Sequence, residues 1–259
     1  MEALGVCVPR IERDGVHLYY DDCGNGSAVL LHTGGGGDGS MWTSAGYTEE
    51  LSRHRCLLLD HRGRGRSDKP ASIEAHRIEQ YVADVIAVLD AAGIERAAMV
   101  GYSAGGTVGF RVAAAHPERI PALVAIGSVP EPTEVPDLEW PAEIRAAGMR
   151  ATMEAIAAGD AEPPPRWFID NLATTEAEMF ALTIEAWAEA EPSWNYLPLI
   201  AAPTLLICGS KEGPTEAVRR AADRLPNGRS VVVPGYGHLQ TFWHREVTGP
   251  LVSDFLAEV

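Results

Sequence analysis

The sequence predicts an α/β fold in which a doubly wound, mostly parallel β-sheet carries an inserted helical cap. Three observations lead to this prediction. Apolar, β-rich runs of strand length recur along the chain, and most are continuous rather than alternating, which is typical of parallel strands covered on both faces. Helical patterns separate these runs, and such alternation of β and α predicts a doubly wound sheet. One long segment, 131–198, interrupts the alternation.

The expected strands and helices can be placed by their residue ranges. The apolar runs are 28–32, 55–60, 97–101, 122–127, 203–208 and 230–234. Ahead of them, the segment GVHLYYDDCGNGSAVLL contains a strand, an Asn25-Gly26 turn and a second strand, which predicts a β-hairpin and an antiparallel edge. The clearest helix is QYVADVIAVLDAAG, with one apolar face and a glycine stop.

The segment 131–198 is rich in proline and alanine and has a helical pattern. Its 68 residues are too many for one βα connection, although a set of ordinary crossover helices is the alternative. We predict a helical cap at 131–198 on a core formed by 1–130 and 199–259. Four of the six tryptophans either line a substrate pocket or pack the cap on the core: Trp140, Trp167, Trp187 and Trp194.

The segment MVGYSAGG contains the pattern G-x-S-x-G through Gly101, Ser103 and Gly105. The pattern follows an expected strand and precedes the helical segment TVGFRVAAA. A serine at the tip of such a turn needs small neighbours, and the N-terminus of the helix favours developing negative charge. An incidental serine in a glycine-rich turn is the alternative, which the flanking strand and helix disfavour. Ser103 is therefore the candidate nucleophile.

A serine hydroxyl needs a base within hydrogen-bond reach, and that base needs an acceptor that orients it. Of the eight histidines, His238 follows the expected strand 230–234 through a glycine-containing turn. Glu212 follows the strand before it, and the order Ser, acid, His is the one expected for this architecture. Glu131, placed after an earlier strand, is the alternative acid.

Backbone N–H groups are needed to bind the oxyanion that forms when a carbonyl is attacked. Ala104, the residue after the candidate nucleophile, is expected to supply one donor. The run HTGGGG can supply the second from Gly34, whose backbone can approach a ligand closely because it has no side chain. The run lacks the lysine of a P-loop and the spaced glycines of a dinucleotide site. We therefore expect no phosphate or nucleotide cofactor.

Composition excludes several classes of protein. With 46% hydrophobic and 22% charged residues the chain can bury a core, and a net charge of −15 disfavours binding to nucleic acid or to an anionic membrane. No signal-peptide pattern or membrane span is apparent, which predicts a cytoplasmic protein. The cysteines form no CxxC pair and are predicted to be buried free thiols rather than disulfides or metal ligands: Cys7, Cys23, Cys56 and Cys208.

The predicted cap is strongly acidic. Residues 131–198 contain 14 acidic residues against Arg145, Arg150 and Arg166, a net of −11. Most of these charges are expected on a solvated face, and any that reach the pocket disfavour a multiply anionic substrate.

The motifs occur together and in order: LHTGGGG, DHRGRGRSDKP, GYSAGG, HPERI, GSKE and GYGHLQTFWHRE. With these motifs the chain, apart from the predicted cap, resembles the α/β-hydrolase superfamily in its branch of esterases, lactonases and C–C hydrolases. The resemblance implies the α/β-hydrolase fold. It also implies that Ser103, His238 and Glu212 are nucleophile, base and acid, and that the amides of Gly34 and Ala104 form the oxyanion hole.

Two residues depart from the pattern of that family. Thr33 stands where relatives usually have glycine, which could move the oxyanion donor to Gly35. Glu212 replaces the usual aspartate, and its longer arm needs a slightly withdrawn backbone. The resemblance further implies that the arginine-rich loop at 62–66 is structural rather than an anion site.

These observations predict a serine hydrolase that needs no cofactor or metal and acts on a small-molecule substrate. Ser103 is expected to attack the carbonyl of an ester or lactone in a neutral, apolar or cyclic substrate, His238 to relay the proton, and water to release the acyl group. Two alternatives stay open. The same residues could cleave a carbon–carbon bond in a diketone-like substrate, or the fold could serve a non-catalytic small-molecule receptor.

Overall fold

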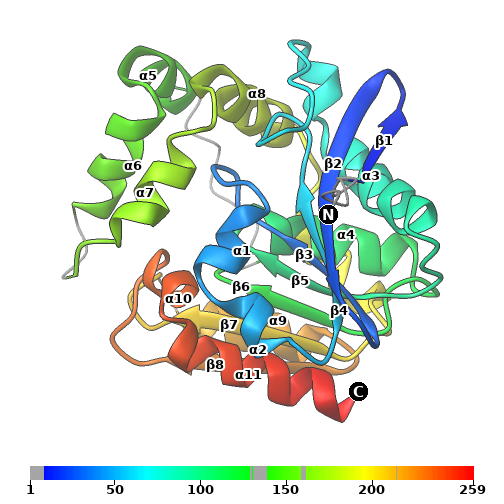
Figure 1. Cartoon of the computed structure of the whole chain (residues 1–259). Coiled ribbons are helices and arrows are strands. Elements are labelled where there is room, and N and C mark those ends of the chain that lie inside the picture. The colour runs from blue at the N-terminus through cyan, green and yellow to red at the C-terminus, as the bar shows by residue number, and fades with distance from the viewer. Residues whose placement is uncertain (1–8, 129, 131–138, 159–161, 214) are drawn as a thin grey trace, which may run out of the picture.

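The predicted parallel strands are neighbours in one eight-stranded sheet and extend to one of its edges. We use a computed structural model, which describes residues 9–128, 130, 139–158, 162–213 and 215–259. The strands follow the order β1-β2-β4-β3-β5-β6-β7-β8 (Figure 1). They are β1 (Arg10–Arg13), β2 (Val16–Gly24), β3 (Ala28–His32), β4 (Arg55–Asp60), β5 (Ala98–Tyr102), β6 (Leu123–Ile126), β7 (Thr204–Gly209) and β8 (Gly228–Val233). Neighbours from β4 to β8 pair in parallel, which confirms the predicted fold class.

The antiparallel edge is present, but the hairpin predicted at its turn was wrong. The chain reverses at 25–26, yet Gly24 of β2 and Ala28 of β3 both pair with Arg55, so β4 lies between the two strands. The actual hairpin joins β1 to β2 through residues 14–15, which both have positive φ, as tight hairpin turns favour. The local turn signal was correct, but the strand that fills the gap comes from later in the chain.

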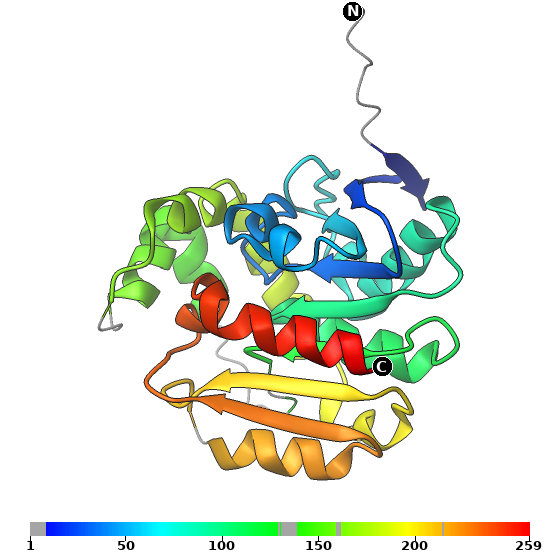
Figure 2. The ribbon, with the colours of Figure 1, turned by 60° about the horizontal axis from the view of Figure 1, so that its bottom comes forward.

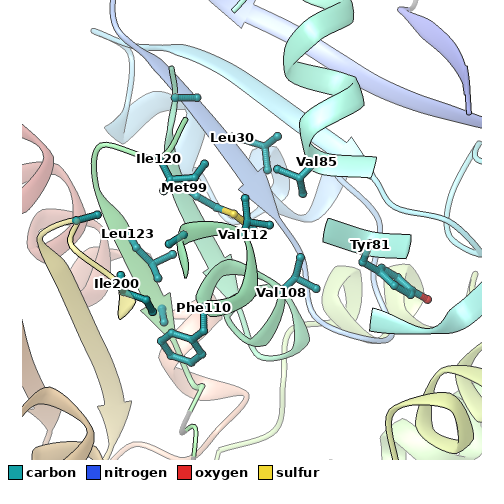
Figure 3. Packing of buried hydrophobic residues seen from close by; sticks show 14 of the residues in the cluster. Leu30, Tyr81, Val85, Met99, Val108, Phe110, Val112, Ile120, Leu123 and Ile200 are labelled. Carbon is teal, nitrogen blue, oxygen red and sulfur yellow. The ribbon is translucent and has the colours of Figure 1, made fainter. Parts of the chain in front are cut away.

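Helices cover both faces of the sheet and leave one apolar cluster on each side. On one face lie α3 (Ile78–Ala91), α4 (Ala104–Ala115) and α9 (Thr215–Arg224). On the other lie α1 (Ser40–Ser44), α2 (Tyr47–Glu50), α10 (Gln240–Trp243) and α11 (Arg245–Glu258). Figure 2 shows α11 and α9 on opposite sides of β7 and β8. In the first cluster, side chains of β3, β5 and β6 pack against α3 and α4 (Figure 3).

Between β6 and β7 the described residues form four further α-helices. They are α5 (Trp140–Ala147), α6 (Met149–Ala157), α7 (Arg166–Leu172) and α8 (Ala177–Ala188), called the inserted helices below. They lie beyond the carboxyl ends of the parallel strands rather than on a face of the sheet (Figure 1). Short 3-10 turns at Ser193–Asn195 and Leu197–Leu199 lead back to β7, and a third at Ile73–His76 contacts α8.

The acidic residues described on the inserted helices lie at the surface, where arginines of the same helices pair with several of them. Arg145 bonds both Glu178 and Glu185, at 2.5 Å each. Arg150 bonds Asp170 at 2.8 Å. These pairs are partly exposed, so solvent screens them and each adds little to stability.

Two of the predicted buried thiols are buried and one is not. Cys56 and Cys208 are free and buried in β4 and β7, and burial raises their thiol pKa values to about 12 and about 11. Cys23 is free but exposed, which corrects the prediction: the last three residues of β2, to which it belongs, are all exposed. Cys7 lies outside the described residues.

The helices are short compared with a membrane span. Among those described, α3 and α11 are the longest at 14 residues each, whereas a span needs about 20 apolar residues. In the described part of the chain, no helix is both long enough and apolar enough to cross a membrane.

Candidate active site

Ser103 occupies the sharp turn between β5 and α4. Its φ of 52° and ψ of −118° are strained for a residue with a side chain. Its neighbours must be small: a Cβ added to Gly101 would lie 2.3 Å from the backbone of Gly105, and one added to Gly105 would lie 2.2 Å from the His32 carbonyl oxygen. The glycines of the motif therefore permit the turn that presents the serine.

The structure brings His238 and Glu212 to Ser103 at the carboxyl edge of the sheet. His238 Nε2 lies 3.1 Å from Ser103 Oγ, and His238 Nδ1 lies 3.2 Å from Glu212 Oε2. A neutral imidazole that donates Nδ1–H to a carboxylate keeps Nε2 as an acceptor for the serine proton. Only 7% of the Glu212 side chain is exposed, against 40% for His238. The arrangement can therefore carry a proton from the serine while the acid stays shielded.

The carboxylate of Glu212 is fixed at its other oxygen. Oε1 accepts a 2.6 Å hydrogen bond from the Gly209 N–H and lies 2.9 Å from Thr241 Oγ1. The Glu212 N–H in turn donates to the Gly209 carbonyl, so the chain curls back after β7 and accommodates the longer arm of a glutamate. Thr241 was missed by sequence analysis, although its place three residues after His238 was a usable signal. Glu131, the alternative acid, lies outside the described residues.

The imidazole of His238 lies in a slot formed by two residues near the turn. Tyr102 stacks on it, with ring centroids 5.3 Å apart and an angle of 24° between the planes. On the side of Glu212, Gly127 has a φ of 61°, and a Cβ there would lie 3.0 Å from His238 Nδ1. Both residues orient the ring, and neither was singled out from the sequence.

Gly34 and Ala104 flank the serine as the oxyanion prediction requires. A Cβ at Gly34 would lie 3.2 Å from Ser103 Cβ, whereas one at Gly35 would lie 2.6 Å from the Phe180 ring. Gly34 rather than Gly35 therefore lies against the serine. Ala104 is the first residue of α4. Within the described residues, neither the Gly34 nor the Ala104 N–H has a hydrogen-bond acceptor, so both are available to a ligand.

A cavity of about 460 Å³ opens between Ser103 and the inserted helices. Its lining has no Asp, Glu, Lys or Arg among the described residues, and the lining side chains that carry a polar group are Tyr102, Ser103, Trp140, Thr183, Trp187 and His238. No group of His, Cys, Asp or Glu in the described ranges is arranged to hold a metal ion. The cavity is lined by Gly34, Gly35, Gly36, Met41, Tyr102, Ser103, Ala104, Trp140, Met153, Ile156, Phe168, Leu172, Phe180, Thr183, Ile184, Trp187, His238 and Leu239.

The four tryptophans singled out from the sequence divide into two pairs. Trp140 and Trp187 line the cavity. Trp167 does not: it packs edge-on against Phe168, which does line it, with centroids 5.6 Å apart. Trp194 lies in the 3-10 turn after α8, where it packs on the core and the Arg224 guanidinium lies 5.1 Å from its ring. For Trp167 and Trp194 the packing interpretation replaces the pocket one.

Two histidines are buried beside the glycine run. His32 and His61 stack with centroids 4.8 Å apart, and each is about 1–2% exposed. Burial lowers the pKa of His32 to about 4 and that of His61 well below its usual value. His32 Nδ1 lies 2.9 Å from the Thr33 carbonyl, and among the described residues its Nε2 has no partner. Both rings are therefore neutral at pH 7.

We expect acid to destabilise the protein partly through His32. Its pKa is lower in the folded state than in the unfolded chain, so the unfolded state takes up a proton first, and stability falls as the pH drops below about 6.5. From pH 7 to pH 4.5 this one group should cost about 2 to 3 kcal/mol. Urea unfolding at the two pH values should show a smaller loss in His32→Asn, which keeps a donor to Thr33. The assignment would be contradicted if His32→Asn lost as much stability between the two pH values as the native chain. It would also be contradicted if the control His116→Gln, at a partly exposed residue, showed the same smaller loss as His32→Asn.

Comparison with known proteins places the molecule among hydrolases. The family model of the alpha/beta hydrolase fold matches residues 27–177. RutD of Caulobacter sp. (strain K31), a proposed carbamate hydrolase, is 32% identical over 248 residues that cover 88% of this chain and 90% of RutD. A 2-hydroxymuconate semialdehyde hydrolase of Pseudomonas putida is 29% identical and covers 96% of this chain and 95% of its own. The solved enol-lactonase of Burkholderia xenovorans LB400 has a TM-score of 0.82 and 26% identity, covering 96% of this chain and 100% of its own.

Proposed function

The chain belongs to the α/β-hydrolase family, and from this premise we propose that it is a serine hydrolase that cleaves an ester or lactone of a small neutral molecule. The observation that carries the proposal is the hydrogen-bonded chain from Ser103 through His238 to Glu212 at the floor of an uncharged cavity. An activated serine beside free backbone donors is the arrangement that acyl transfer requires.

In the proposed mechanism, Ser103 Oγ attacks the carbonyl carbon while His238 Nε2 takes its proton. The N–H groups of Gly34 and Ala104 bind the developing oxyanion. His238 then gives its proton to the leaving oxygen, and an acyl group stays on Ser103. Water, activated by the same nitrogen, releases the acid. Glu212 stays ionised and stabilises the imidazolium in both steps.

The proposed substrate is a neutral, apolar small molecule. The side chains that line the cavity are mostly aliphatic and aromatic, and an anionic group placed among them would lose its hydration without gaining a partner. The acidic residues of the inserted helices make the surroundings still less favourable for an anion. A volume of about 460 Å³ suits a small ester or lactone. The likeness to an enol-lactonase supports lactones as one class.

A panel of p-nitrophenyl esters tests the function. We expect turnover of neutral esters with an optimum at a moderate acyl length, and little turnover of an ester whose acyl chain ends in a carboxylate. A fluorophosphonate should label Ser103, as tryptic mass mapping can establish. The absence of both turnover and labelling would overturn the proposal. Ligand-induced stabilisation without turnover would instead indicate a receptor.

Carbamate hydrolysis is a second candidate, favoured by the 32% identity to RutD. A carbamate carbonyl can be attacked by the same serine, so the panel should include a p-nitrophenyl carbamate. Continuous turnover of this carbamate, rather than a single burst of p-nitrophenol, would assign carbamates as the substrate class. Product analysis would reveal the other alternative, carbon–carbon cleavage of a diketone-like substrate, because that reaction releases no alcohol.

A further inference from the structure

The glycine-rich loop beside Ser103, residues 33–37 and called the oxyanion loop below, is held at every carbonyl. Each of its five carbonyl oxygens lies within hydrogen-bond distance of a side chain. The partners are His32 Nδ1 at 2.9 Å for Thr33, His61 Nε2 at 3.2 Å for Gly34, Arg64 Nε at 2.5 Å for Gly35, Thr175 Oγ1 at 2.6 Å for Gly36, and Thr33 Oγ1 at 3.0 Å for Gly37. Side chains therefore fix a segment that is mostly glycine and has little conformational preference of its own.

Holding the carbonyls also sets the direction of the amides. The described peptide bonds are all trans, and in a trans peptide the C=O of one residue points opposite to the N–H of the next. The Thr33 carbonyl near His32 Nδ1 therefore sets the direction of the Gly34 N–H, and the Gly35 carbonyl bonded by Arg64 sets that of the Gly36 N–H; Gly34 and Gly36 both line the cavity. Donors in an oxyanion hole must be oriented before the reaction if they are to favour the transition state over the substrate.

Arg64 is the unusual member of this set. Its side chain is fully buried, and it donates to Gly35 O at 2.5 Å, to Gly63 O at 3.1 Å and to Thr183 Oγ1 at 3.3 Å. No carboxylate among the described residues pairs with it. The neighbouring arginines differ, because Arg62 bonds Asp84 and Arg66 bonds Asp60 and Asp21, at 2.6 to 3.0 Å.

A buried cation without an anion is costly. Burial lowers the pKa of Arg64 to about 10, so the guanidinium is still charged at neutral pH. The bonds to two carbonyls and a hydroxyl, together with the Phe180 ring 5.9 Å away, offset part of that cost. A positive charge behind the oxyanion loop also favours negative charge in front of it, which develops only in the transition state.

The inserted helices take part in the same network. Thr183, which accepts from Arg64, belongs to α8 and lines the cavity. Thr175, between α7 and α8, donates to the Gly36 carbonyl. At the end of α7, Asn171 bonds the N–H and the carboxylate of Asp38, at 3.2 and 2.9 Å. The oxyanion loop therefore lies between a buried arginine of the core and three polar side chains of the inserted segment.

We propose that Arg64 and Thr175 are positioning residues that hold the oxyanion loop from the core and from the segment between α7 and α8. By fixing the peptides that follow Gly35 and Gly36, they keep the loop, and with it the Gly34 N–H donor, in place when the inserted helices are seated on the core. The inference rests on the proposed function, because it assigns these residues to the oxyanion site of the same reaction. Neither residue lines the cavity among the described lining residues, so neither is expected to bind the substrate directly.

Arg64→Met and Thr175→Val remove the hydrogen bonds while keeping most of the shape. For the best ester of the panel we expect kcat to fall about 10- to 100-fold with KM changed less than about threefold, the loss expected from misplaced donors. The matched thionoester, whose sulfur is a weak hydrogen-bond acceptor, should lose far less, so the ester-to-thionoester rate ratio should drop. Labelling of Ser103 by a fluorophosphonate should slow in parallel. The pH dependence of kcat should stay native, because His238 and Glu212 are untouched.

The matched controls are Arg53→Met and Thr174→Val, which change exposed residues. Both variants should keep the native kcat, KM and ester-to-thionoester rate ratio. The proposal would be overturned if both test variants kept the native ester-to-thionoester rate ratio, whether the two rates were unchanged or fell equally. A change in KM alone would also overturn it. If Arg64→Met does not fold, as judged by circular dichroism, Thr175→Val decides by the same ratio. Absence of turnover and labelling in the native chain would instead refute the proposed function, and the inference with it.

Discussion

Replacing Ser103 or His238 with alanine is expected to lower kcat for a neutral p-nitrophenyl ester by about 10⁶-fold. The two side chains lie 3.1 Å apart and act in a single proton transfer. Without the base, the serine hydroxyl is not activated at neutral pH, and without the serine, the base has no nucleophile to activate. The double variant should therefore be no slower than either single variant. Some rate above that in water should persist, because the cavity and the oxyanion donors still bind the ester.

Steady-state rates at saturating ester, with active-site titration of the native chain, measure this effect. Ser52→Ala and His116→Ala, which change residues away from the cavity, should keep the native rate. Thermal unfolding should show that all variants are folded. A Ser103→Ala variant with more than about 1% of the native rate would mean that another group attacks the carbonyl, and additive losses in the double variant would mean that the two side chains act in separate steps.

The parts of the molecule that sequence patterns predicted well are those fixed by local constraints. Continuous apolar runs gave the six parallel strands because a strand buried on both faces has no polar side to show. The turn at Ser103 was predictable because close backbone contacts, such as that of Gly105 with the His32 carbonyl, exclude any side chain there. The position of Glu212 and His238 after successive strands followed from the same regularity, since parallel strands end at one edge.

The features that escaped prediction depend on contacts between distant segments. The hairpin predicted at 25–26 is not formed because both β2 and β3 pair with β4, which begins 31 positions after Gly24 and 27 positions after Ala28. Whether a tryptophan of the inserted segment faces the cavity depends on how the helices sit on the core, which periodicity does not encode. The bonds of Arg64 and Thr175 to the oxyanion loop join residues 29 and 139 positions apart, and arginine and threonine are common surface residues.

Glu212→Gln is expected to lower kcat by about 10⁴-fold with little change in KM. The carboxylate accepts on both sides: from His238 Nδ1 at one oxygen, and from the Gly209 N–H and the Thr241 hydroxyl at the other. A glutamine offers one acceptor and one donor. If its oxygen faces Gly209, its NH₂ group faces Nδ1 and favours the tautomer with the proton on Nε2, which cannot take the serine proton. If its oxygen faces His238, its NH₂ group faces the Gly209 N–H, and the two donors repel.

The same geometry makes Glu212→Asp an informative partner variant. It keeps the charge but shortens the arm, so one carboxylate cannot reach both His238 and the Gly209 N–H without moving the backbone after β7. We expect an intermediate loss of about 10- to 100-fold, against none for Glu131→Gln, the variant of the alternative acid. Rates measured across pH 5 to 9 separate a wrong tautomer, which lowers the plateau, from a shifted base, which moves the profile. Near-native activity in Glu212→Gln with a large loss in Glu131→Gln would transfer the role of the acid to Glu131.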